Sequence, residues 1–409
     1  MRRVVITGLG AVTPIGNTVP ETWENVKAGK CGIAPITHFD TTERKVKVAG
    51  EVKNLDLESI IDKKELRKMD KFSAFGIIAA REAVQDAGIS FEADSERCGA
   101  IISSGIGGLQ TIAEGQDTGR TKGFDRVSPY FIPSCIGNMA AGRIALEHVL
   151  RGMCSDVVTA CAGGTNAVGD AFRHIRDGYA EVMLCGGAEA SITELGVGAF
   201  TSLNALCRAE DPNRASIPFD KERSGFVMGE GAGILVLEEL EHAKARGAKI
   251  YAEVVGYGAN CDAHHITAPL EDGSGAAKCM ELAMKDGNVM PEQIQYINAH
   301  GTSTPLNDKG ETRAVKTAFG NHAKNLMMSS TKSMTGHLLG ASGAVEAIVT
   351  ALAVQNDFAP ATINYQVPDE ECDLDIVPNV GRTAEIEYAM SNSLGFGGHN
   401  ATIIIKKYK

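Results

Sequence analysis

The sequence contains no long apolar run, and no segment approaches the roughly 20 consecutive apolar residues of a membrane-spanning helix. Its first residues, MRRVVITGLG, enter a β-branched run at once and show no signal-peptide core. Ten cysteines are present, but none forms a CxxC pair, and no zinc-ribbon or disulfide pattern occurs. We therefore expect a cytoplasmic protein with no membrane partner, whose thiols are mostly inert core side chains.

Positive charge is also scarce. Forty lysines and arginines stand against 51 aspartates and glutamates, which gives a formal net charge of -11. Generic nucleic-acid binding needs a basic surface, so we expect no nucleic-acid partner. An acidic protein partner would require a local basic patch. The glycine-rich segments 8–16 and 103–109 match neither GxGxxG nor GxxxxGK[ST], which favours tight turns over nucleotide-binding loops.

Short β-branched runs alternate with longer helical periods along the 409 residues. One amphipathic helix is predicted at DKFSAFGIIAAREAVQDAG, where Gly88 closes it. Strands are predicted at RRVVITGL, CGAIISSG, DVVTAC, EVMLCGG and GILVLEE. This alternation predicts an α/β fold with buried, mostly parallel sheets.

Two partial echoes indicate an internal repeat. The segment TACAGGTNAVGDAFRHI resembles MTGHLLGASGAVEAIVTAL, and RVVITGLGAVTP resembles AEVVGYGANCDA. We predict two related halves, residues 1–249 and 250–409. No Pro/Ser-rich linker separates them, so we expect one continuous core.

Cys161 lies between an apolar run and the small residues that open a predicted helix. The N–H groups and dipole of a helix N-terminus stabilise a thiolate and lower the pKa of the thiol. The same N–H groups can hold an oxyanion, and the small residues leave room for a substrate. A nucleophilic cysteine is one interpretation. A buried structural cysteine is the other, and this stretch by itself favours it.

Two histidines occupy positions where α/β folds gather their chemistry. His300 follows the predicted strand QYINA, and His337 lies in a Gly/Ser-rich lead into a helix, five residues after Lys332. Phe396 lies in the glycine-rich loop SNSLGFGGHN between two predicted strands. Each of these residues also has an ordinary packing interpretation. No metal-ligand spacing is recognisable, so we predict no catalytic metal, and a cysteine hydrolase stays open.

Five segments together carry a resemblance to a known family. TACAGGTNA, DKERSGFVMGEGAG, NAHGTSTPLND, STKSMTGHLLGASGAVEA and SNSLGFGGHNA occur in this order. They resemble the β-ketoacyl-[acyl-carrier-protein] synthases, the condensing enzymes of fatty acid synthesis, over essentially the whole chain. Within the family, HGTSTPLNDKGET and TKSMTGHLLGA are closer to synthase II than to synthase I. The resemblance implies a thiolase-like fold with duplicated halves in a five-layered α-β-α-β-α core, and a homodimer.

The resemblance implies a decarboxylative Claisen condensation. Cys161 takes an acyl chain from acyl carrier protein (ACP), malonyl-ACP loses CO₂, and the resulting carbanion attacks the acyl thioester. Backbone N–H groups of Cys161 and Phe396 would hold the oxyanion, and His300 and His337 would hold the enolate oxygen. Lys332, with Glu346 as its partner, would support the histidines. No cofactor is implied beyond the phosphopantetheine that the substrate carries.

Further residues are assigned only by the resemblance. Thr302 and Thr304 would bind the phosphopantetheine arm. Phe200 and Phe396 would form a gate pair around the acyl chain, and Ile106 and Phe131 would line the acyl pocket near the dimer interface. A structural monovalent cation is implied near Asn298, Glu346, Ser391 and Asn392. Two positions depart from the family: Gly163 stands where serine or threonine is common, and Ser342 stands where alanine is common.

The run DKKELRKMDK supplies the local basic patch that an acidic carrier protein requires. Its candidate docking residues are Lys63, Lys64, Arg67 and Lys68. A solvated helix face is the alternative for this run, and Arg126, Arg208 and Arg214 are further docking candidates. A stand-alone polyketide ketosynthase and, in another class, a cysteine hydrolase or thioesterase remain alternative functions.

Overall fold

The computed structural model describes residues 1–92 and 94–409. Its centre is a ten-stranded sheet with the order β10-β9-β13-β14-β8-β1-β7-β6-β4-β5. These strands are β1 (Val4–Val12), β4 (Cys98–Ser103), β5 (Cys154–Ser155), β6 (Val182–Glu189), β7 (Gly231–Glu239), β8 (Ala252–Cys261), β9 (Tyr296–Asn298), β10 (Met327–Ser329), β13 (Tyr388–Gly395) and β14 (His399–Lys407). Two small sheets pair β2 (Ala34–Pro35) with β3 (Val48–Ala49) and β11 (Phe358–Ala359) with β12 (Arg382–Thr383).

The large sheet consists of two five-stranded halves with the same pattern of strand directions. In the first half, β1, β7 and β6 are antiparallel neighbours, and β6, β4 and β5 run parallel. In the second half, β8, β14 and β13 are antiparallel, and β13, β9 and β10 run parallel. A short antiparallel pairing of β1 with β8 joins the halves.

The sheet is therefore mixed, and the prediction of mostly parallel strands is wrong. Strands covered by helices on both faces are continuously apolar whichever way their neighbours run. Every residue of β1 and β7 is buried, for example, although the two strands are antiparallel. The apolar runs thus predicted burial correctly and carried no information on direction.

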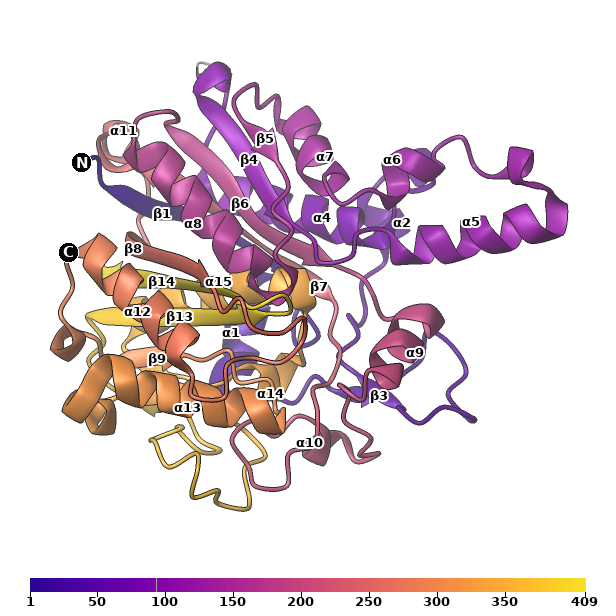
Figure 1. Cartoon of the computed structure of the whole chain (residues 1–409). Helices are drawn as coiled ribbons and strands as arrows, with labels where there is room; N and C mark the ends of the chain where they lie inside the picture. The colour runs from indigo at the N-terminus through magenta and orange to yellow at the C-terminus, as the bar shows by residue number, and fades with distance from the viewer. Residues whose placement is uncertain (93) are drawn as a thin grey trace.

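Helices form three layers around the two half-sheets (Figure 1). The central layer holds α8 (Gly163–Arg176) and α15 (Ser342–Asn356). The outer face of the first half is covered by α4 (Lys71–Ala87) and α7 (Met139–His148). The outer face of the second half is covered by α12 (Ser274–Gly287) and α13 (Pro305–Phe319). This arrangement confirms the thiolase-like, five-layered α/β fold, while the division at residues 249/250 stays a prediction.

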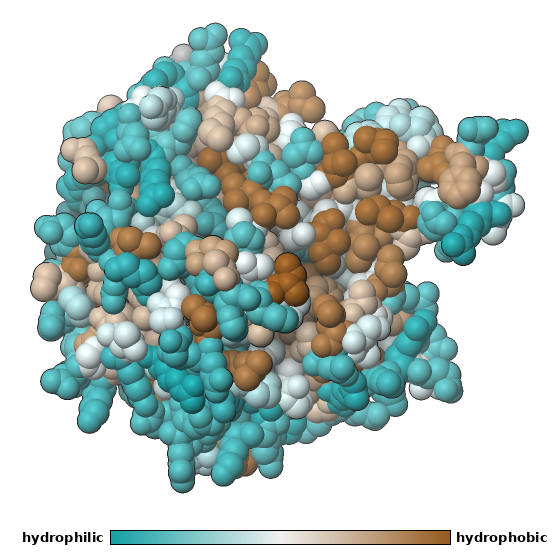
Figure 2. Space-filling view, viewed as in Figure 1, coloured by the Kyte–Doolittle hydropathy of each residue, from teal (hydrophilic) through white to brown (hydrophobic). Residues whose placement is uncertain are grey.

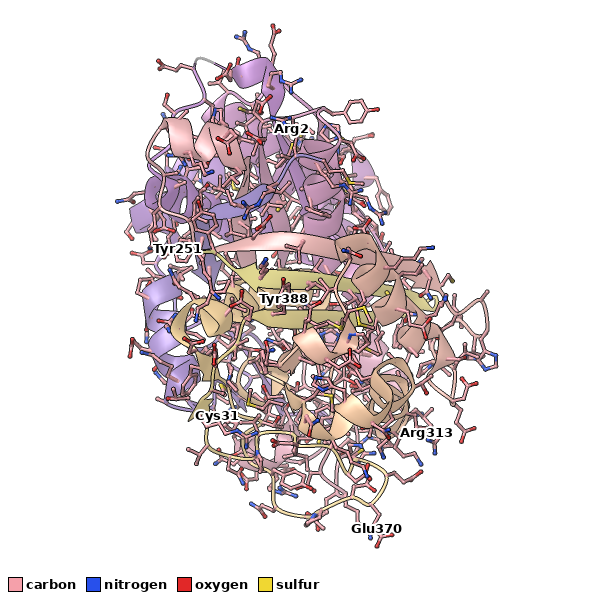
Figure 3. The ribbon with its side chains drawn as sticks, turned by 90° about the vertical axis from the view of Figure 1, so that its left-hand side faces the viewer. Arg2, Cys31, Tyr251, Arg313, Glu370 and Tyr388 are labelled. Atoms are coloured by element: carbon pink, nitrogen blue, oxygen red, sulfur yellow. The ribbon has the colours of Figure 1, made fainter. Side chains whose placement is uncertain are left out.

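The remaining helices are shorter or lie outside these layers. They are α1 (Val19–Lys27), α2 (Leu57–Ile60), α3 (Lys63–Leu66), α5 (Leu109–Lys122), α6 (Phe131–Cys135), α9 (Glu194–Ser202), α10 (Pro212–Ala215), α11 (Leu240–Ala245) and α14 (Lys332–Thr335). Both α5 and α6 project from the body (Figure 1). From the side, Arg2 lies with the first half, and Arg313 and Glu370 lie at the opposite end (Figure 3). In the described residues, no helix combines the length and the apolarity that crossing a membrane requires.

The two central helices meet backbone to backbone. A Cβ on Gly164 would lie 2.7 Å from the amide nitrogen of Ala344, and one on Gly343 would lie 2.6 Å from that of Thr165. Only glycine permits such an approach. Because Cys161 and His337 immediately precede these helices, the contact brings two segments far apart in sequence to one place.

The segment before Cys161 differs from the prediction. Only Cys154–Ser155 forms a strand, residues 156–159 have no regular structure, and Ala160–Ala162 form a 3₁₀ turn. The strand predicted at DVVTAC is therefore wrong. The carbonyl of Val157 accepts a hydrogen bond from the Ser103 hydroxyl at 2.7 Å. A side chain, and not the backbone of a neighbouring strand, therefore satisfies this carbonyl. The helix closed by Gly88 is confirmed, since Gly88 caps α4 with φ +58°.

Candidate active site

A cavity of about 310 Å³ opens where the two central helices begin. Residues of both halves of the chain line it. Those already singled out from the sequence are Cys161, Phe200, His300, Thr302, Thr304, His337 and Phe396. In Figure 2, apolar side chains gather around a hollow in the middle of the face shown.

Cys161 lies in a sharp turn at the N-terminal end of α8. Ala160, which opens the 3₁₀ turn, has φ +49°, a left-handed conformation that is strained for a residue with a side chain. Leu339 has φ +48° and opens the 3₁₀ turn Leu339–Ala341, which leads into α15 in the same way. The two halves thus enter their central helices through matching turns, and only the first carries a thiol there.

The electrostatics of Cys161 differ from the prediction for a helix N-terminus. Burial raises the pKa of this thiol to about 11, although the charge of Lys332 and the backbone N–H of Phe396 act in the opposite direction. The expected net lowering of its pKa is wrong, because desolvation by the cavity walls outweighs the helix end and the nearby cation. At neutral pH the free enzyme therefore holds a neutral thiol.

His300 follows β9 directly and is held by its backbone. The N–H groups of His300 and Gly301 each donate to one carboxylate oxygen of Glu311 on α13, at 2.8 Å. The ring is buried, and the pKa of His300 lies well below its ordinary value because of burial, then the charge of Lys332, then His337. The imidazole is therefore neutral at neutral pH.

His337 faces His300 across the cavity. The two ring centroids are 5.3 Å apart with planes at 85°. Its backbone N–H donates to the Val227 carbonyl at 2.7 Å, and its Nδ1 lies 2.8 Å from the Ser342 hydroxyl. Burial, followed by the charge of Lys332, lowers its pKa well below the ordinary value. Two neutral imidazoles can donate hydrogen bonds to one point without mutual charge repulsion.

Lys332 is a buried cation behind the histidines. Its ammonium bonds the carboxylate of Glu346, the partner expected from the sequence, and lies 3.5 Å from Nδ1 of His300. Burial raises the pKa of Glu346 to about 7, against the lowering effect of Lys332. Lys332 thus places a positive charge beside the imidazoles, and the carboxylate of Glu346 compensates that charge.

The glycine loop after β13 brings Phe396 to Cys161. A Cβ on Gly395 would lie 2.7 Å from the Thr159 carbonyl oxygen and 3.2 Å from the amide nitrogen of Cys161, so the two backbones are in contact. The Phe396 ring lies 6.4 Å from that of Phe200. The loop thus supplies both an N–H group next to the thiol and an aromatic wall.

Thr302 and Thr304 form a polar edge of the same cavity. Their hydroxyl oxygens are 2.9 Å apart. Ser303, between them, has φ +68°, and its buried hydroxyl oxygen accepts a hydrogen bond from the Ile217 N–H at 3.0 Å. The turn therefore presents the two threonines to the cavity and keeps the serine in the protein interior.

Two family models match the chain over most of its length: "Beta-ketoacyl synthase, N-terminal domain" over residues 1–243 and "Beta-ketoacyl synthase, C-terminal domain" over residues 251–366. The chain belongs to the β-ketoacyl synthase family. The chain is 52% identical to a 3-oxoacyl-[acyl-carrier-protein] synthase 2 of Synechocystis, covering 100% of this chain and 99% of the relative. It is 51% identical to that of Staphylococcus aureus strain COL, with the same coverage.

Solved ketosynthase structures have the same fold. A β-ketoacyl synthase from Burkholderia phymatum is 34% identical with a TM-score of 0.93, and both chains are fully covered. A type II polyketide ketosynthase, solved in complex with its acyl-carrier protein, is 37% identical with a TM-score of 0.90 and full coverage. The present chain is thus a condensing enzyme, an acyltransferase of fatty acid elongation.

Other residues predicted for this ketosynthase lie away from the cavity. Ile106, in the loop after β4, is 37% exposed, and the Phe131 ring packs over Gly115 of α5. Neither lines the cavity as far as the chain is described, so their role in an acyl pocket stays a prediction. The basic residues of 63–68 lie in and just after α3 on the surface.

The four residues expected around a cation divide between two faces of the sheet. Asn298 and Ser391 are register neighbours on β9 and β13, on the face that packs against α15, which carries Glu346. In contrast, the Asn392 amide reaches the other face, where it donates to Glu311 and to the Met280 sulfur. The structure therefore does not bring the Asn392 side chain together with the other three.

Sequence analysis missed three residues that touch the histidines. Glu311 clamps the backbone of His300, the Phe226 ring lies 5.2 Å from that of His337, and Ser342 meets His337 at Nδ1. Phe226 and Ser342 lie in the five segments that carried the family resemblance, and Glu311 lies in HGTSTPLNDKGET. Their chemical types gave no reason to single them out, because each contact spans a turn or joins separate elements.

Proposed function

We propose that Cys161, His300 and His337 of this ketosynthase extend an acyl chain by two carbons, with acyl-ACP and malonyl-ACP as substrates. The observation that carries the proposal is one thiol and two neutral imidazoles at a single cavity, with a backbone N–H beside the thiol. The names of the 52% and 51% identical relatives support ACP as the carrier.

In the first half-reaction, the sulfur of Cys161 attacks the thioester carbonyl of acyl-ACP. The carbonyl oxygen becomes an oxyanion that accepts from the N–H groups of Cys161 and Phe396. The bond to the pantetheine sulfur then breaks, and that sulfur takes the proton which the neutral Cys161 thiol loses. The products are acyl-Cys161 and free ACP thiol.

In the second half-reaction, malonyl-ACP enters the same cavity. The bond to its carboxylate breaks, CO₂ leaves, and the electron pair forms an enolate whose oxygen accepts hydrogen bonds from His300 and His337. The enolate carbon attacks acyl-Cys161 and expels the cysteine sulfur, which takes up a proton. The product is 3-oxoacyl-ACP, and no strong base is needed because decarboxylation generates the carbanion.

The alternatives have less support. A hydrolase must admit and activate water, and the predominantly apolar lining around Cys161 opposes this. The 3-oxoacyl-[acyl-carrier-protein] synthase relatives are 51–52% identical, whereas the polyketide ketosynthase solved in complex with its carrier protein is 37% identical. The cytoplasmic location expected from the sequence stays a prediction.

The carrier protein is proposed to dock on Arg208, beside the cavity, and on the basic residues in and just after α3. Arg208 donates to the side-chain oxygen of Asn204 at 2.7 Å, and Asn204 lines the cavity. Among the described residues, Lys64 and Arg67 are exposed and form no ion pair, whereas Lys68 pairs with Glu65. Exposed and uncompensated charges steer an acidic partner most effectively.

A homodimer is proposed from an apolar surface over α5, α6, α7 and β5. Large exposed side chains gather there, and Figure 2 shows this apolar surface on the projecting arm. They are Ile112, Phe124, Tyr130, Ile132, Ile136, Leu146, Val149 and Met153. The short strand β5 also leaves a sheet edge unpaired within the described chain. A second copy of the chain would cover both features.

A structural monovalent cation fits three of the four expected residues. In the described structure, both polar atoms of the Asn298 amide, the Ser391 hydroxyl and one oxygen of Glu346 are buried without a hydrogen-bond partner. Oxygen atoms left unsatisfied in this way are the donors that a hard cation takes. Such an ion would brace β9, β13 and α15 and would take no part in the reaction.

The test of the proposed function is intact-mass analysis with a long-chain acyl-ACP, followed by malonyl-ACP. The wild type gains one acyl group and then discharges it as 3-oxoacyl-ACP two carbons longer. Cys161→Ser gains no stable thioester, whereas the control Cys154→Ser, which removes an exposed thiol, behaves as wild type. Discharge only as free acid would show a hydrolase, and no adduct would refute the carrier-bound substrate.

A further inference from the structure

The buried hydroxyl of Ser342 contacts one of the two histidines. Ser342 is the first residue of α15, and its Oγ lies 2.8 Å from Nδ1 of His337. The 3₁₀ turn Leu339–Ala341 closes the loop between them. Both side chains are only 2% exposed, so water does not compete for this contact.

The direction of this hydrogen bond follows from a count of partners. Among the described residues, Nδ1 of His337 is the only hydrogen-bond partner of the Ser342 hydroxyl. If Nδ1–H donated to the serine, the hydroxyl proton would be buried with no acceptor, which costs about 1–3 kcal/mol. If the hydroxyl donates to Nδ1, its proton is satisfied. Ser342 is therefore the donor, and Nδ1 is the acceptor.

The direction decides where the imidazole keeps its proton. His337 is neutral at neutral pH, because burial and the charge of Lys332 lower its pKa. A neutral imidazole whose Nδ1 accepts must carry its hydrogen on Nε2. Nε2–H is then the donor left to face the cavity, which His337 lines.

We propose that Ser342 is a positioning residue for His337: its hydroxyl holds the ring in the tautomer that can donate to the enolate oxygen of malonyl-ACP. This inference rests on the proposed function. The acylation of Cys161 does not use His337 and is unaffected by this hydrogen bond.

The test compares wild type, Ser342→Ala and Ser73→Ala. Ser73 is a buried serine of α4 whose hydroxyl has no partner in the described structure, so its removal controls for the loss of a buried hydroxyl. Selective ¹⁵N labelling of histidine gives the tautomer by NMR, and His337→Gln identifies the signal. Release of CO₂ from malonyl-ACP and acylation of Cys161 are measured separately.

The wild type is expected to show only Nε2–H at His337. Ser342→Ala should populate both tautomers and lower kcat for CO₂ release by about threefold to tenfold, the range of one lost hydrogen bond. Its KM for malonyl-ACP and its acylation rate should stay within about twofold of the wild type, because the contact acts on neither substrate binding nor the acylation of Cys161. Ser73→Ala should change none of these.

Two results would overturn the inference: Nδ1–H at His337 in the wild type, or an unchanged tautomer and unchanged CO₂ release in Ser342→Ala. A wild type that releases no CO₂ from malonyl-ACP would refute the proposed function. In that case the NMR tautomers still decide whether Ser342 orients the ring, so the two failures are distinguishable.

Discussion

Nζ of Lys332 lies 3.5 Å from Nδ1 of His300, and both side chains are buried. A buried ammonium opposes a second positive charge at this distance, so its charge helps to keep the imidazole neutral. Glu346 compensates the ammonium on its other side. The charge on Lys332 thus adds to burial, the larger cause, in keeping His300 neutral.

Removing the positive charge of Lys332 is predicted to shift the acid limb of the pH profile of malonyl-ACP decarboxylation to higher pH. In the wild type, the low pKa of His300 keeps the limb well below pH 6.5. In Lys332→Met, one cause of the lowered His300 pKa is removed, so the ring becomes charged at a higher pH and the acid limb moves upward, although burial still keeps this pKa below its ordinary value. The measurement is a pH profile of CO₂ release.

The double variant Lys332→Met/Glu346→Gln is the control for this change, because it leaves no unpaired buried carboxylate. An unpaired buried charge costs about 3–5 kcal/mol of stability, so the single variant is also expected to melt earlier. A limb that stays at the wild-type pH in both variants would exclude electrostatic control by Lys332.

A methyl group at Gly164 is predicted to disrupt the site from within. The new Cβ would lie 2.9 Å from the Gly340 carbonyl oxygen and 2.7 Å from the amide nitrogen of Ala344, both backbone atoms. The central helices must separate, which displaces Cys161 from the histidines. We expect Gly164→Ala to lose at least about 1–3 kcal/mol of stability by overpacking and most of its activity.

Thermal melting and adduct formation check this prediction. Gly198→Ala in α9 is the matched control, since a Cβ there would meet no atom within 4 Å and φ is not left-handed. It should be neutral or slightly stabilising. Equal melting temperatures for the two alanine variants would disprove a tight helix contact.

Glu189, at the end of β6, is predicted to make stability fall with rising pH. Burial raises its pKa to about 7, although Ser191 and the N–H groups of Gly105 and Gly340 favour the ionised form. The folded chain therefore holds a proton that the unfolded chain releases near pH 4.5. The stability contributed by this bound proton is fully present below pH 4.5 and is lost as the pH rises through 7. The total loss is about 3 kcal/mol.

Glu189→Gln removes this titration. The melting temperature of the wild type, taken relative to that of the variant, should fall by a few degrees between pH 5 and pH 8. Glu241→Gln, an exposed change on α11, is the control and should give a constant difference. A constant difference for Glu189→Gln as well would show that the carboxyl titrates normally.

Charge reversal at the proposed docking patch is predicted to weaken use of acyl-ACP. Arg67→Glu and Arg208→Glu should raise KM for acyl-ACP and reduce its dependence on salt, with kcat little changed, because rim charges act on association. Lys278→Glu on α12 makes the same charge change elsewhere on the surface and is the control. An identical salt dependence in all three variants would count against docking at this patch.

Removal of monovalent cations is predicted to destabilise the enzyme. Exchange of K⁺ for choline should lower the melting temperature by a few degrees, because the buried oxygens of Asn298, Ser391 and Glu346 lose their partner. Ser391→Ala should reduce this difference, whereas Asn392→Ala should retain it. If the wild type melts identically in both salts, the three oxygens hold no exchangeable ion.

The pattern of residues was enough to predict the fold class and most of the side chains that the structure gathers at one cavity. Continuous apolar runs marked the buried strands, and five motifs in a fixed order placed Cys161, His300, Lys332, His337 and Phe396 at strand exits and helix entries. These features follow from local chain chemistry, because burial and turns depend on residues close together in the sequence. The same motifs carried the resemblance that the family models confirm.

The tertiary structure alone decided the direction of the strands, the sign of the Cys161 pKa shift, and which face of the sheet Asn392 occupies. An apolar run is the same in a parallel and an antiparallel buried strand. The pKa of Cys161 depends on desolvation by walls from both halves of the chain, which outweighs the local helix end. The contact between Ser342 and His337 likewise spans a turn in which Leu339 is left-handed, with φ +48°.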